Sequence, residues 1–369
     1  MAGTVISQTN TLTVSTKVQA VYDRMLLTRA IDNTVWDMFG QAKTIPAKSN
    51  TKKGFARRYK NILPATTPLA EYNGTVKGGN KIVSEEVEFS VAHYGDYVMI
   101  TDELELYNYD NIQSVYTDIL GDQADLTVET IRRDALRGGT NVIYAGGAIS
   151  RKAMIDAAKA KPADGLATIK DLKTAALKLK KQRGRKFKKV ITGSTAVGTT
   201  PIRSAYIGVI SQEVTEDYRE LAGWKNVEDY ANYGNSINED EVGSYGDFRF
   251  VESTNNDPIV AQGTAGTDVN VYPTILLAQD AYATTTLRGK GGIRAIVKAI
   301  GSAGANDPLE QYGSFGWKCI TGCAILNEAW LIRLEQMASM EISTAKHYID
   351  YSAHPNPISG LTGNGINLS

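Results

Sequence analysis

The chain has 369 residues, of which 42% are hydrophobic and 22% are charged, as is ordinary for a folded soluble protein. Lys and Arg together number 40, as do Asp and Glu, so the net charge of zero points to neither a nucleic-acid nor a membrane partner. Two cysteines, Cys319 and Cys323, exclude a disulfide framework. Four positions apart on a strand, they would lie about 13 Å from each other, too far to bridge, which fits a cytosolic origin.

No apolar run approaches the length of a membrane span, and no basic region precedes an apolar run near the N-terminus. We therefore expect a soluble protein without a cleaved signal. The length allows two domains or one elongated subunit with lobes.

The N-terminal segment Met1–Thr16 is rich in Thr, Ser, Gln and Asn, and we expect an arm that orders only against a partner. Apolar residues at helical spacing then predict a helix over Val18–Phe39 that stops at Gly40.

A long hairpin is predicted next. A basic strand is predicted where Phe55, Arg57 and Tyr59 alternate with small or basic residues. An acidic strand is predicted over Val87–His93, where apolar residues alternate with acidic and small ones, and it continues into Tyr97–Thr101. The section between is rich in turn residues, including Asn73-Gly74 and Gly78-Gly79. A hairpin of this size cannot bury its own faces, so it needs the body of the chain or a neighbouring subunit.

The most distinctive element is a long helix within Asn108–Thr140. Asp110 and Gln113 form a capping-box pattern, Gly138-Gly139 is a stop signal, and apolar residues recur at helical spacing between them. About 28 residues at about 1.5 Å each would make a rod of roughly 42 Å. Such a rod suits a protein that builds a wide, thin wall, although an ordinary amphipathic helix covering a sheet fits the same pattern.

The remainder predicts a compact α+β lobe. Helices are expected over Ala153–Ala160, Thr168–Gln182 and around Thr215–Leu221. The expected strands of the lobe are Lys189–Thr192, Ala205–Ile210, Phe248–Glu252, Thr274–Leu277 and Ile293–Ile300. A buried strand over Trp317–Leu326, a helix over Ala329–Met340 and a loose tail from Ser352 complete the chain.

Charge is distributed in blocks of alternating sign. Seven basic residues and no acid lie in Phe39–Ala70, then nine acids and two lysines in Glu71–Asp110. Ten basic residues and one acid lie in Gly165–Lys189, then nine acids and two basic residues in Ser211–Glu241. Blocks of opposite sign suit complementary faces on identical copies, and they equally suit solvated faces. Lys43–Lys60 and Lys170–Lys189 could also contact phosphates.

Residues for catalysis are scarce. His93, His347 and His354 have no carboxylate or cysteine at metal-ligand spacing, and the two cysteines read as core residues. Gly193-Ser194-Thr195 lacks an identifiable base, and Gly289-Lys290-Gly291-Gly292 lacks the spacing of a phosphate-binding loop. Glu85-Glu86 and Asn238–Glu241 read as solvated surface, with a weak Ca²⁺ site as the alternative. We predict no enzyme activity, no cofactor and no metal.

Four short motifs occur in an order that resembles the major capsid proteins of tailed bacteriophages, whose fold, the Johnson fold, recurs in herpesvirus shells. They are Pro68–Glu71, Tyr94–Asp102, Ala278–Tyr282, and Asp307–Gly313 leading into Gly316-Trp317-Lys318. The resemblance covers roughly Val18–Met340. One departure lies at the hairpin tip, where Tyr72-Asn73 precede Gly74 and no proline follows.

The resemblance implies an α+β tailed-phage capsid fold with an N-terminal arm and helix (1–40) and an extended hairpin loop (41–105). The peripheral domain would consist of the segment with the spine helix (106–165) and of a return strand and helix (307–345). The axial domain (166–306) would lie between these two segments in the sequence, and a C-terminal tail (346–369) would end the chain. It further implies contacts between subunits that pair the two charge types. The basic candidates are Lys52, Lys53, Arg57, Arg58 and Lys60, and the acidic ones are Glu85, Glu86, Glu88, Glu216 and Asp217.

The implied function is self-assembly into an icosahedral shell of hexameric and pentameric capsomers around double-stranded DNA, held by non-specific contacts. A portal and a separate scaffolding protein are implied partners, because the chain lacks the acidic helical N-terminal domain of some relatives. The implied location is the virion capsid, assembled in the host cytoplasm. A tail or baseplate protein, an encapsulin-type compartment and a small oligomeric enzyme are the alternatives.

Overall fold

A computed structural model describes residues 35–47, 51–59, 62, 64, 66, 81–107, 112–189, 201–229, 240–264, 266, 268–289, 292–302 and 308–339. The chain divides into two compact units. Unit 1 combines Met1–Leu136 with Tyr282–Leu326, and unit 2 combines Arg137–Ala281 with Asn327–Ser369. Each unit mixes helices and strands, so the fold class is α+β, as predicted.

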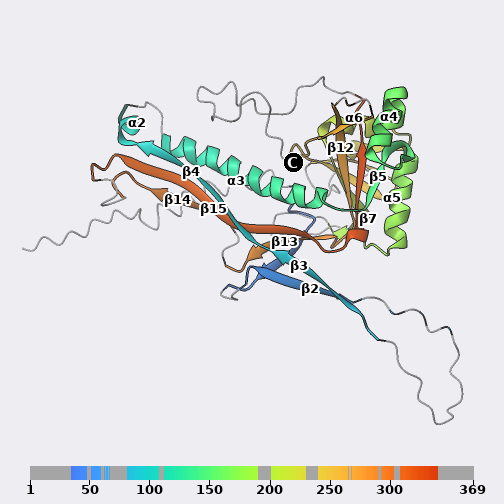
Figure 1. Ribbon diagram of the computed structural model, residues 1–369, viewed down its shortest axis with the longest axis horizontal. Coiled ribbons are helices and arrows are strands. Elements are labelled where there is room, and N and C mark those ends of the chain that lie inside the picture. Colours follow the sequence, from blue (N-terminus) through green and yellow to red (C-terminus); the bar gives the residue numbers. More distant parts are fainter. Residues whose placement is uncertain are drawn as a thin grey trace, which may run out of the picture. The chain divides into compact units, whose positions relative to one another are not determined.

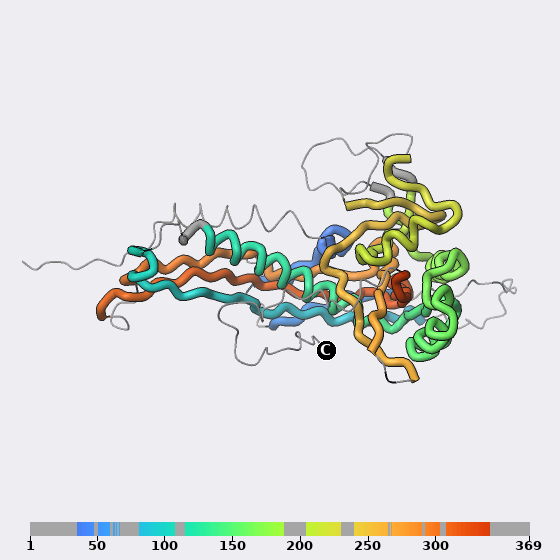
Figure 2. Tube along the Cα trace, turned by 90° about the horizontal axis from the view of Figure 1, so that it is seen from above, coloured from blue at the N-terminus to red at the C-terminus, as the bar shows by residue number. Residues whose placement is uncertain are grey.

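Unit 1 is built around one long helix, α3 (Ile112–Arg137), which lies alongside a sheet of long strands (Figures 1 and 2). The central strand is the 14-residue β15 (Tyr312–Ile325). It pairs antiparallel with β4 (Ala92–Thr101) on one side, and with β14 (Arg294–Lys298) and β13 (Tyr282–Leu287) on the other. The short strand β1 (Gln41–Ile45) pairs parallel with β13, and a short helix, α2 (Asp102–Tyr107), follows β4 directly.

The core of unit 1 lies between α3 and this sheet. Leu120, Ala124 and Val128 are four residues apart on α3, so they form one buried stripe. The stripe packs against alternate residues of β15, namely Phe315, Trp317 and Cys319, and against Ile100 and Ala295. β15 confirms the predicted buried strand over Trp317–Leu326, although it begins five residues earlier and ends one residue earlier.

The predicted hairpin is present as β2 (Lys53–Tyr59) paired antiparallel with β3 (Ser84–Ser90). Its base is held by a small cluster in which Phe89 packs with Ile45, Val91 and Ile320. A Cβ on Gly54 would lie 2.4 Å from the Phe89 ring, so only glycine leaves room for that ring.

Unit 2 contains a sheet with the strand order β5-β16-β12-β7-β10-β9-β8, to which β11 adds beside β12 and β6 beside β7. Its strands are β5 (Val142–Tyr144), β6 (Phe187–Lys189), β7 (Pro201–Ile210), β8 (Lys225–Asn226), β9 (Glu241–Tyr245), β10 (Phe248–Glu252), β11 (Ile259–Gln262), β12 (Asp268–Leu277) and β16 (Leu331–Gln336).

Two helices, α5 (Ile169–Lys181) and α6 (Gln212–Arg219), pack on this sheet in one apolar cluster that includes Leu172, Leu179, Val214 and Phe250. A third helix, α4 (Arg151–Ala160), packs through Met154 and Ile155 in a separate cluster with Val271. The N-terminus of α5 carries a capping box in which Thr168 and Asp171 bond reciprocally, which explains where this predicted helix begins.

The prediction of a helix over Ala329–Met340 is wrong. The short 3-10 helix η6 (Glu328–Trp330) leads instead into strand β16, which lies between β5 and β12 in unit 2. Leu331, Ile332 and Leu334 are all buried, because β16 is covered on both faces. The segment is rich in Leu, Glu, Gln, Met and Ala, which favour helices, and pairing with β5 and β12 overrides that local preference.

Other differences concern strands of unit 1. The strand predicted over Ile293–Ile300 is present as β14, but it pairs with β15 and therefore belongs to unit 1 and not to the lobe of unit 2. β1, β13 and α2 are not predicted at all. The predicted helix over Val18–Phe39 falls largely outside the described residues, and its last residues, from Val35 onward, form turns.

Candidate functional site

The opposite charges of the hairpin pair with each other across its two strands. Antiparallel register places Arg57 opposite Glu86 and Arg58 opposite Glu85. The Arg57 guanidinium nitrogen lies 2.6 Å from a Glu86 oxygen, and the Arg58–Glu85 distance is also 2.6 Å. The hydrogen bond to Glu86 raises the pKa of Arg57 above its ordinary value. The structure therefore brings these predicted residues together within one chain, whereas the sequence prediction assigned the pairing to neighbouring subunits.

The same pairing includes Lys53, whose ammonium lies 2.5 Å from Glu88. Lys52 is exposed beside it, and Lys60 lies outside the described residues. Glu216 and Asp217 are on α6 in unit 2. Glu216 pairs with Arg219 at 2.7 Å, and Asp217 accepts hydrogen bonds from Ser339. The nine described contact candidates thus fall into two groups, one on each unit.

One face of the hairpin exposes two aromatic side chains. Phe55 and Tyr59 alternate with Ala56 and Arg58 along β2, so they point to the same side, and 62% of each residue is exposed. The Arg57–Glu86 ion pair lies between them on that face. Large exposed aromatics flanking a neutralised ion pair are typical of a surface that binds another protein.

A buried carboxylate on α3 holds the segment that precedes β1. Glu129 accepts hydrogen bonds from the backbone nitrogens of Val35, at 2.5 Å, and Trp36, at 3.3 Å. Burial raises the pKa of Glu129 to about 7, even though those hydrogen bonds and the nearby Arg132 and Arg133 favour its charged form. Arg132 pairs with Asp37 at 3.2 Å, and the Tyr282 hydroxyl donates to the Trp36 carbonyl at 2.6 Å. Sequence spacing gave no signal for this anchor, since its members are more than ninety positions apart.

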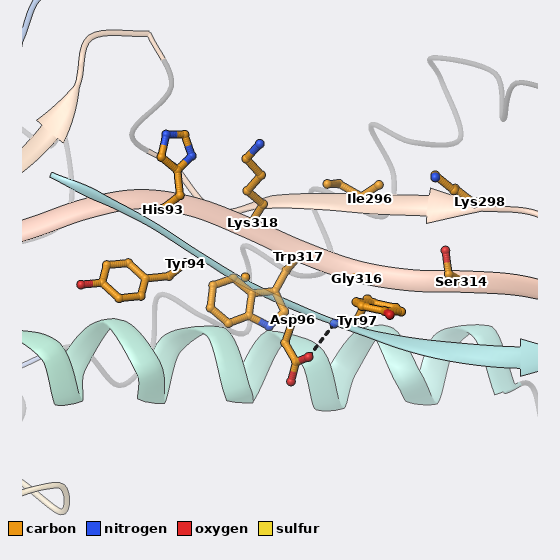
Figure 3. Close-up of a pocket in the computed structure, with 11 residues that line it drawn as sticks. His93, Tyr94, Asp96, Tyr97, Ile296, Lys298, Ser314, Gly316, Trp317 and Lys318 are labelled. Carbon is orange, nitrogen blue, oxygen red and sulfur yellow. Dashed lines mark hydrogen bonds between the residues drawn. The ribbon is translucent and has the colours of Figure 1, made fainter. Parts of the chain in front are cut away.

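The sheet of unit 1 carries a shallow basin over β4, β15 and β14, with a volume of about 490 Å³. Gly95 and Gly316 leave its floor without side chains, and Tyr97 and Ile296 border it. Lys298, Lys318 and His93 extend from the strands away from α3, whereas Trp317 and Asp96 extend toward α3 (Figure 3).

Asp96 is held away from the basin by Gln123 of α3. The Gln123 amide nitrogen donates to Asp96 at 2.7 Å, and its oxygen accepts from the Trp317 indole at 3.0 Å. The basin is therefore rimmed by cations, and Asp96, the one carboxylate among its described lining residues, is turned to the opposite face. The Tyr94–Asp102 motif of the sequence covers β4. Its spacing could not show that Lys298 of β14 and Lys318 of β15 would lie beside β4 in the basin.

Unit 2 contains two buried carboxylates that form ion pairs with arginines. Glu335 on β16 is fully buried and bonds Arg151 of α4 at 2.6 and 2.8 Å and Arg333 at 2.8 Å. Glu241 on β9 is also fully buried at its side chain and pairs with Arg249 at 2.7 Å. The interpretation of Asn238–Glu241 as solvated surface is therefore wrong for Glu241, because it lies inside the sheet; positions 238 and 239 are outside the described residues.

The residues considered for catalysis or metal binding lie partly in the parts of the chain that the structure describes. These parts contain no cluster of His, Cys, Asp or Glu arranged to hold a metal. Cys319 and Cys323 are free on β15, and burial raises the pKa of their thiols to about 11 and about 12. Gly193–Thr195 lies outside the described residues. Among the helices that are described, none is long and apolar enough to cross a membrane.

Comparison with known proteins gives a likeness in structure only. No protein-family model matches the sequence, and no curated protein matches it significantly. The capsid of Ralstonia phage GP4 superposes with a TM-score of 0.61 at 13% identity, covering 81% of this chain and 87% of that one. The capsid of cyanophage P-SCSP1u gives 0.53 at 15% identity over 83% and 88% of the two chains. The capsid of cyanophage Pam1 gives 0.50 at 13% identity over 80% and 87%. The chain therefore has the α+β fold of tailed-phage capsid proteins.

Proposed function

We propose that the chain is the major capsid protein of a tailed phage, many copies of which assemble into an icosahedral shell around double-stranded DNA. The observation that carries this proposal is the fold likeness to solved phage capsids over about four-fifths of the chain. The role is structural: the protein would act through its surfaces and catalyse no reaction.

The hairpin supports the proposal because one of its faces leaves large apolar side chains exposed in the single chain. Its base is anchored by Phe89, but the face that carries Phe55 and Tyr59 is exposed. A two-stranded ribbon gains little stability by itself in water, so it is best explained as a loop that lies across a neighbouring subunit. Its internal ion pairs would then keep it straight, while the aromatic face makes the contact.

The two units would correspond to different domains of a capsid subunit. Unit 1, with α3, the long sheet and the hairpin (41–105), would supply the peripheral domain and the extended loop. Unit 2 would supply the axial domain at capsomer centres, where Glu216 and Asp217 on α6 are candidate contacts. The arm within 1–40 would reach a further neighbour. This division assigns β13 and β14 to the peripheral domain and β16 to the axial domain.

The proposed partners are other copies of the chain, in hexameric and pentameric capsomers, together with a scaffolding protein, a portal and packaged DNA. Assembly would take place in the host cytoplasm before the chain becomes part of the virion. Each exposed ion pair contributes only about 0–1 kcal/mol, so apolar burial repeated over many copies must dominate the assembly energy.

The test is sedimentation of the purified full chain, alone and coexpressed with a candidate scaffolding protein, followed by nuclease treatment. A capsid protein gives a discrete fast-sedimenting species that protects DNA once packaged. Open tubes or small rings under every condition would indicate a tail or baseplate protein instead. Closed shells that enclose a peptide-tagged cargo but never DNA would indicate an encapsulin-type compartment.

A further inference from the structure

We propose that the cation-rimmed basin on β4, β15 and β14 receives the acidic helix α2 of a second copy of this chain. The inference rests on the proposed self-assembly and names one of its contacts. It joins two surfaces of unit 1 that carry opposite charge and that the proposed capsid role alone does not connect.

The basin side is positive and partly apolar. Lys298 and Lys318 are exposed at its rim, and Arg294 lies opposite Lys318 in the strand register on the same face. Among the described residues, no ion pair neutralises these three cations. Tyr97, with 66% of its surface exposed, and Ile296 supply apolar area beside them.

The floor of the basin lets a partner approach the sheet closely. Gly316 lies opposite Tyr97 on one side and Ile296 on the other, and Gly95 lies opposite Lys318. A Cβ on Gly316 would come within 2.8 Å of the Asp96 carbonyl and the Tyr97 Cβ, so this position is closed to larger residues. Gly316 is buried, whereas Gly95 is exposed opposite Lys318, so a partner reaches the strand backbone at Gly95.

The α2 side is negative and apolar. Asp102, Glu103 and Glu105 lie in its first turn, and its last turn contains no basic residue. Leu106 and Tyr107 end the helix with 76% and 84% of their surfaces exposed. No residue of α2 is buried. A short helix of this kind, with acids and large apolar groups both facing solvent, is stabilised when a cationic, partly apolar surface covers it.

A second copy is favoured over nucleic acid as the occupant because one chain supplies both complementary surfaces in equal number. The basin also pairs its lysines with Ile296, an aliphatic side chain that fits Leu106 better than a sugar–phosphate backbone. Duplex DNA would require cations alone.

The test uses charge reversal in the full chain. The tip variant carries Glu103→Lys and Glu105→Lys, and the basin variant carries Lys298→Glu and Lys318→Glu. All four residues are exposed, so both variants should keep the wild-type circular dichroism spectrum and melting temperature. Each variant alone should need at least about tenfold more protein than wild type to associate in sedimentation velocity. An equimolar mixture should recover most of that loss, because each variant then meets a partner of opposite charge.

A matched control is Lys170→Glu with Lys173→Glu on the exposed face of α5, which changes the net charge as the basin variant does. It should associate like wild type. The proposed contact would be overturned if the equimolar mixture associated as weakly as the single variants. It would also be overturned if the control lost as much association as the basin variant.

A second readout separates this contact from shell formation. Glu105→Cys and Lys318→Cys chains, mixed and treated with a short bismaleimide, should give a crosslinked dimer even where no shell forms. The native thiols should react slowly because of their raised pKa values. Normal shells formed by the two cysteine variants without this crosslink would overturn the contact and leave the capsid role standing. A basin variant that assembles normally but loses salt-dependent DNA binding would show that the basin binds nucleic acid instead.

Discussion

The carboxylate of Glu129 in α3 accepts the backbone N–H of Val35 at 2.5 Å and so ties the start of the described chain to the long helix. The bond is buried, and Arg132, Arg133, Asp37 and Tyr282 surround it. Burial disfavours the charge, whereas the two backbone donors require an acceptor there. These opposing requirements make the stability of unit 1 depend on pH.

The direction follows from the raised pKa of Glu129. The pKa of Glu129 is about 7 in the folded state, against an ordinary value of 4.5. At a pH between these two values, Glu129 is protonated in the folded state and has lost its proton in the unfolded state. The contribution of Glu129 to the free energy of unfolding is therefore largest below about pH 4.5. It falls by up to about 3 kcal/mol as the pH rises to about 7. Glu129→Gln keeps an acceptor oxygen and removes the charge. We expect it to raise the melting temperature at pH 8 and to leave it nearly unchanged at pH 5.

Glu129→Leu is the control for that experiment, since it removes the acceptor as well as the charge. It should lower the melting temperature at both pH values, because two buried N–H groups lose their partner. Equal behaviour of the Gln and Leu variants would contradict the role assigned to the carbonyl oxygen.

Reversal of the hairpin arginines tests the ladder of ion pairs. Arg57→Glu with Arg58→Glu places like charges opposite Glu86 and Glu85, and we expect assembly to be lost while the melting temperature changes little. Adding Glu85→Arg and Glu86→Arg restores opposite charges within the hairpin, and assembly should return. Electron microscopy of the two variants provides the measurement. A fourfold variant that still fails to assemble would mean that these side chains contact a neighbouring subunit directly.

The exposed aromatic face of the hairpin should matter for association but not for folding. Phe55→Ala with Tyr59→Ala should abolish or strongly weaken assembly in sedimentation velocity, with melting unchanged. Phe89→Ala is the matched buried control, and it should lower stability by about 3–5 kcal/mol because Phe89 fills the cluster at the hairpin base. Normal assembly of the double variant would argue against this face as an interface.

The buried Glu335 is expected to be essential for unit 2. It neutralises both Arg151 and Arg333, so Glu335→Leu leaves two cations without their partner and should cost about 3–5 kcal/mol. Glu216→Ala removes an exposed pair with Arg219 and should cost at most about 1 kcal/mol. Thermal unfolding of the purified variants compares the two. A small effect at Glu335 would contradict the buried network.

The two thiols should be nearly inert in the folded chain. With pKa values of about 11 and about 12, Cys319 and Cys323 carry little thiolate at pH 8. We expect reaction with a chromogenic disulfide to be slow in buffer and rapid for both thiols in denaturant. Fast reaction of both under native conditions would show that the β15 core is open to solvent.

Much of the fold could be predicted from spacing because local periodicity and caps are sufficient for it. The four-residue repeat of α3, the alternation along β2 and β15, and the Thr168 cap each appear in the sequence as they do in the structure. β16 was misread because its segment is rich in residues that favour helices, and pairing with β5 and β12 overrides that local preference. β13 was missed because Ala283–Thr286 are small or polar, and pairing with β1 and β15 makes them a strand.

The candidate surfaces were harder to predict because they depend on pairing across the chain. Charge blocks identified the hairpin residues, but only the register shows that Arg57 meets Glu86 in the same chain. The basin joins β4 to strands some two hundred positions later, and the Glu129 anchor joins α3 to the segment before β1. No local spacing encodes such contacts.

The most direct measurement of the central claim is negative-stain electron microscopy of the purified full chain, with and without its candidate scaffolding protein. The capsid assignment predicts closed shells of uniform diameter. Discrete monomers, small rings or open tubes under every condition would contradict it.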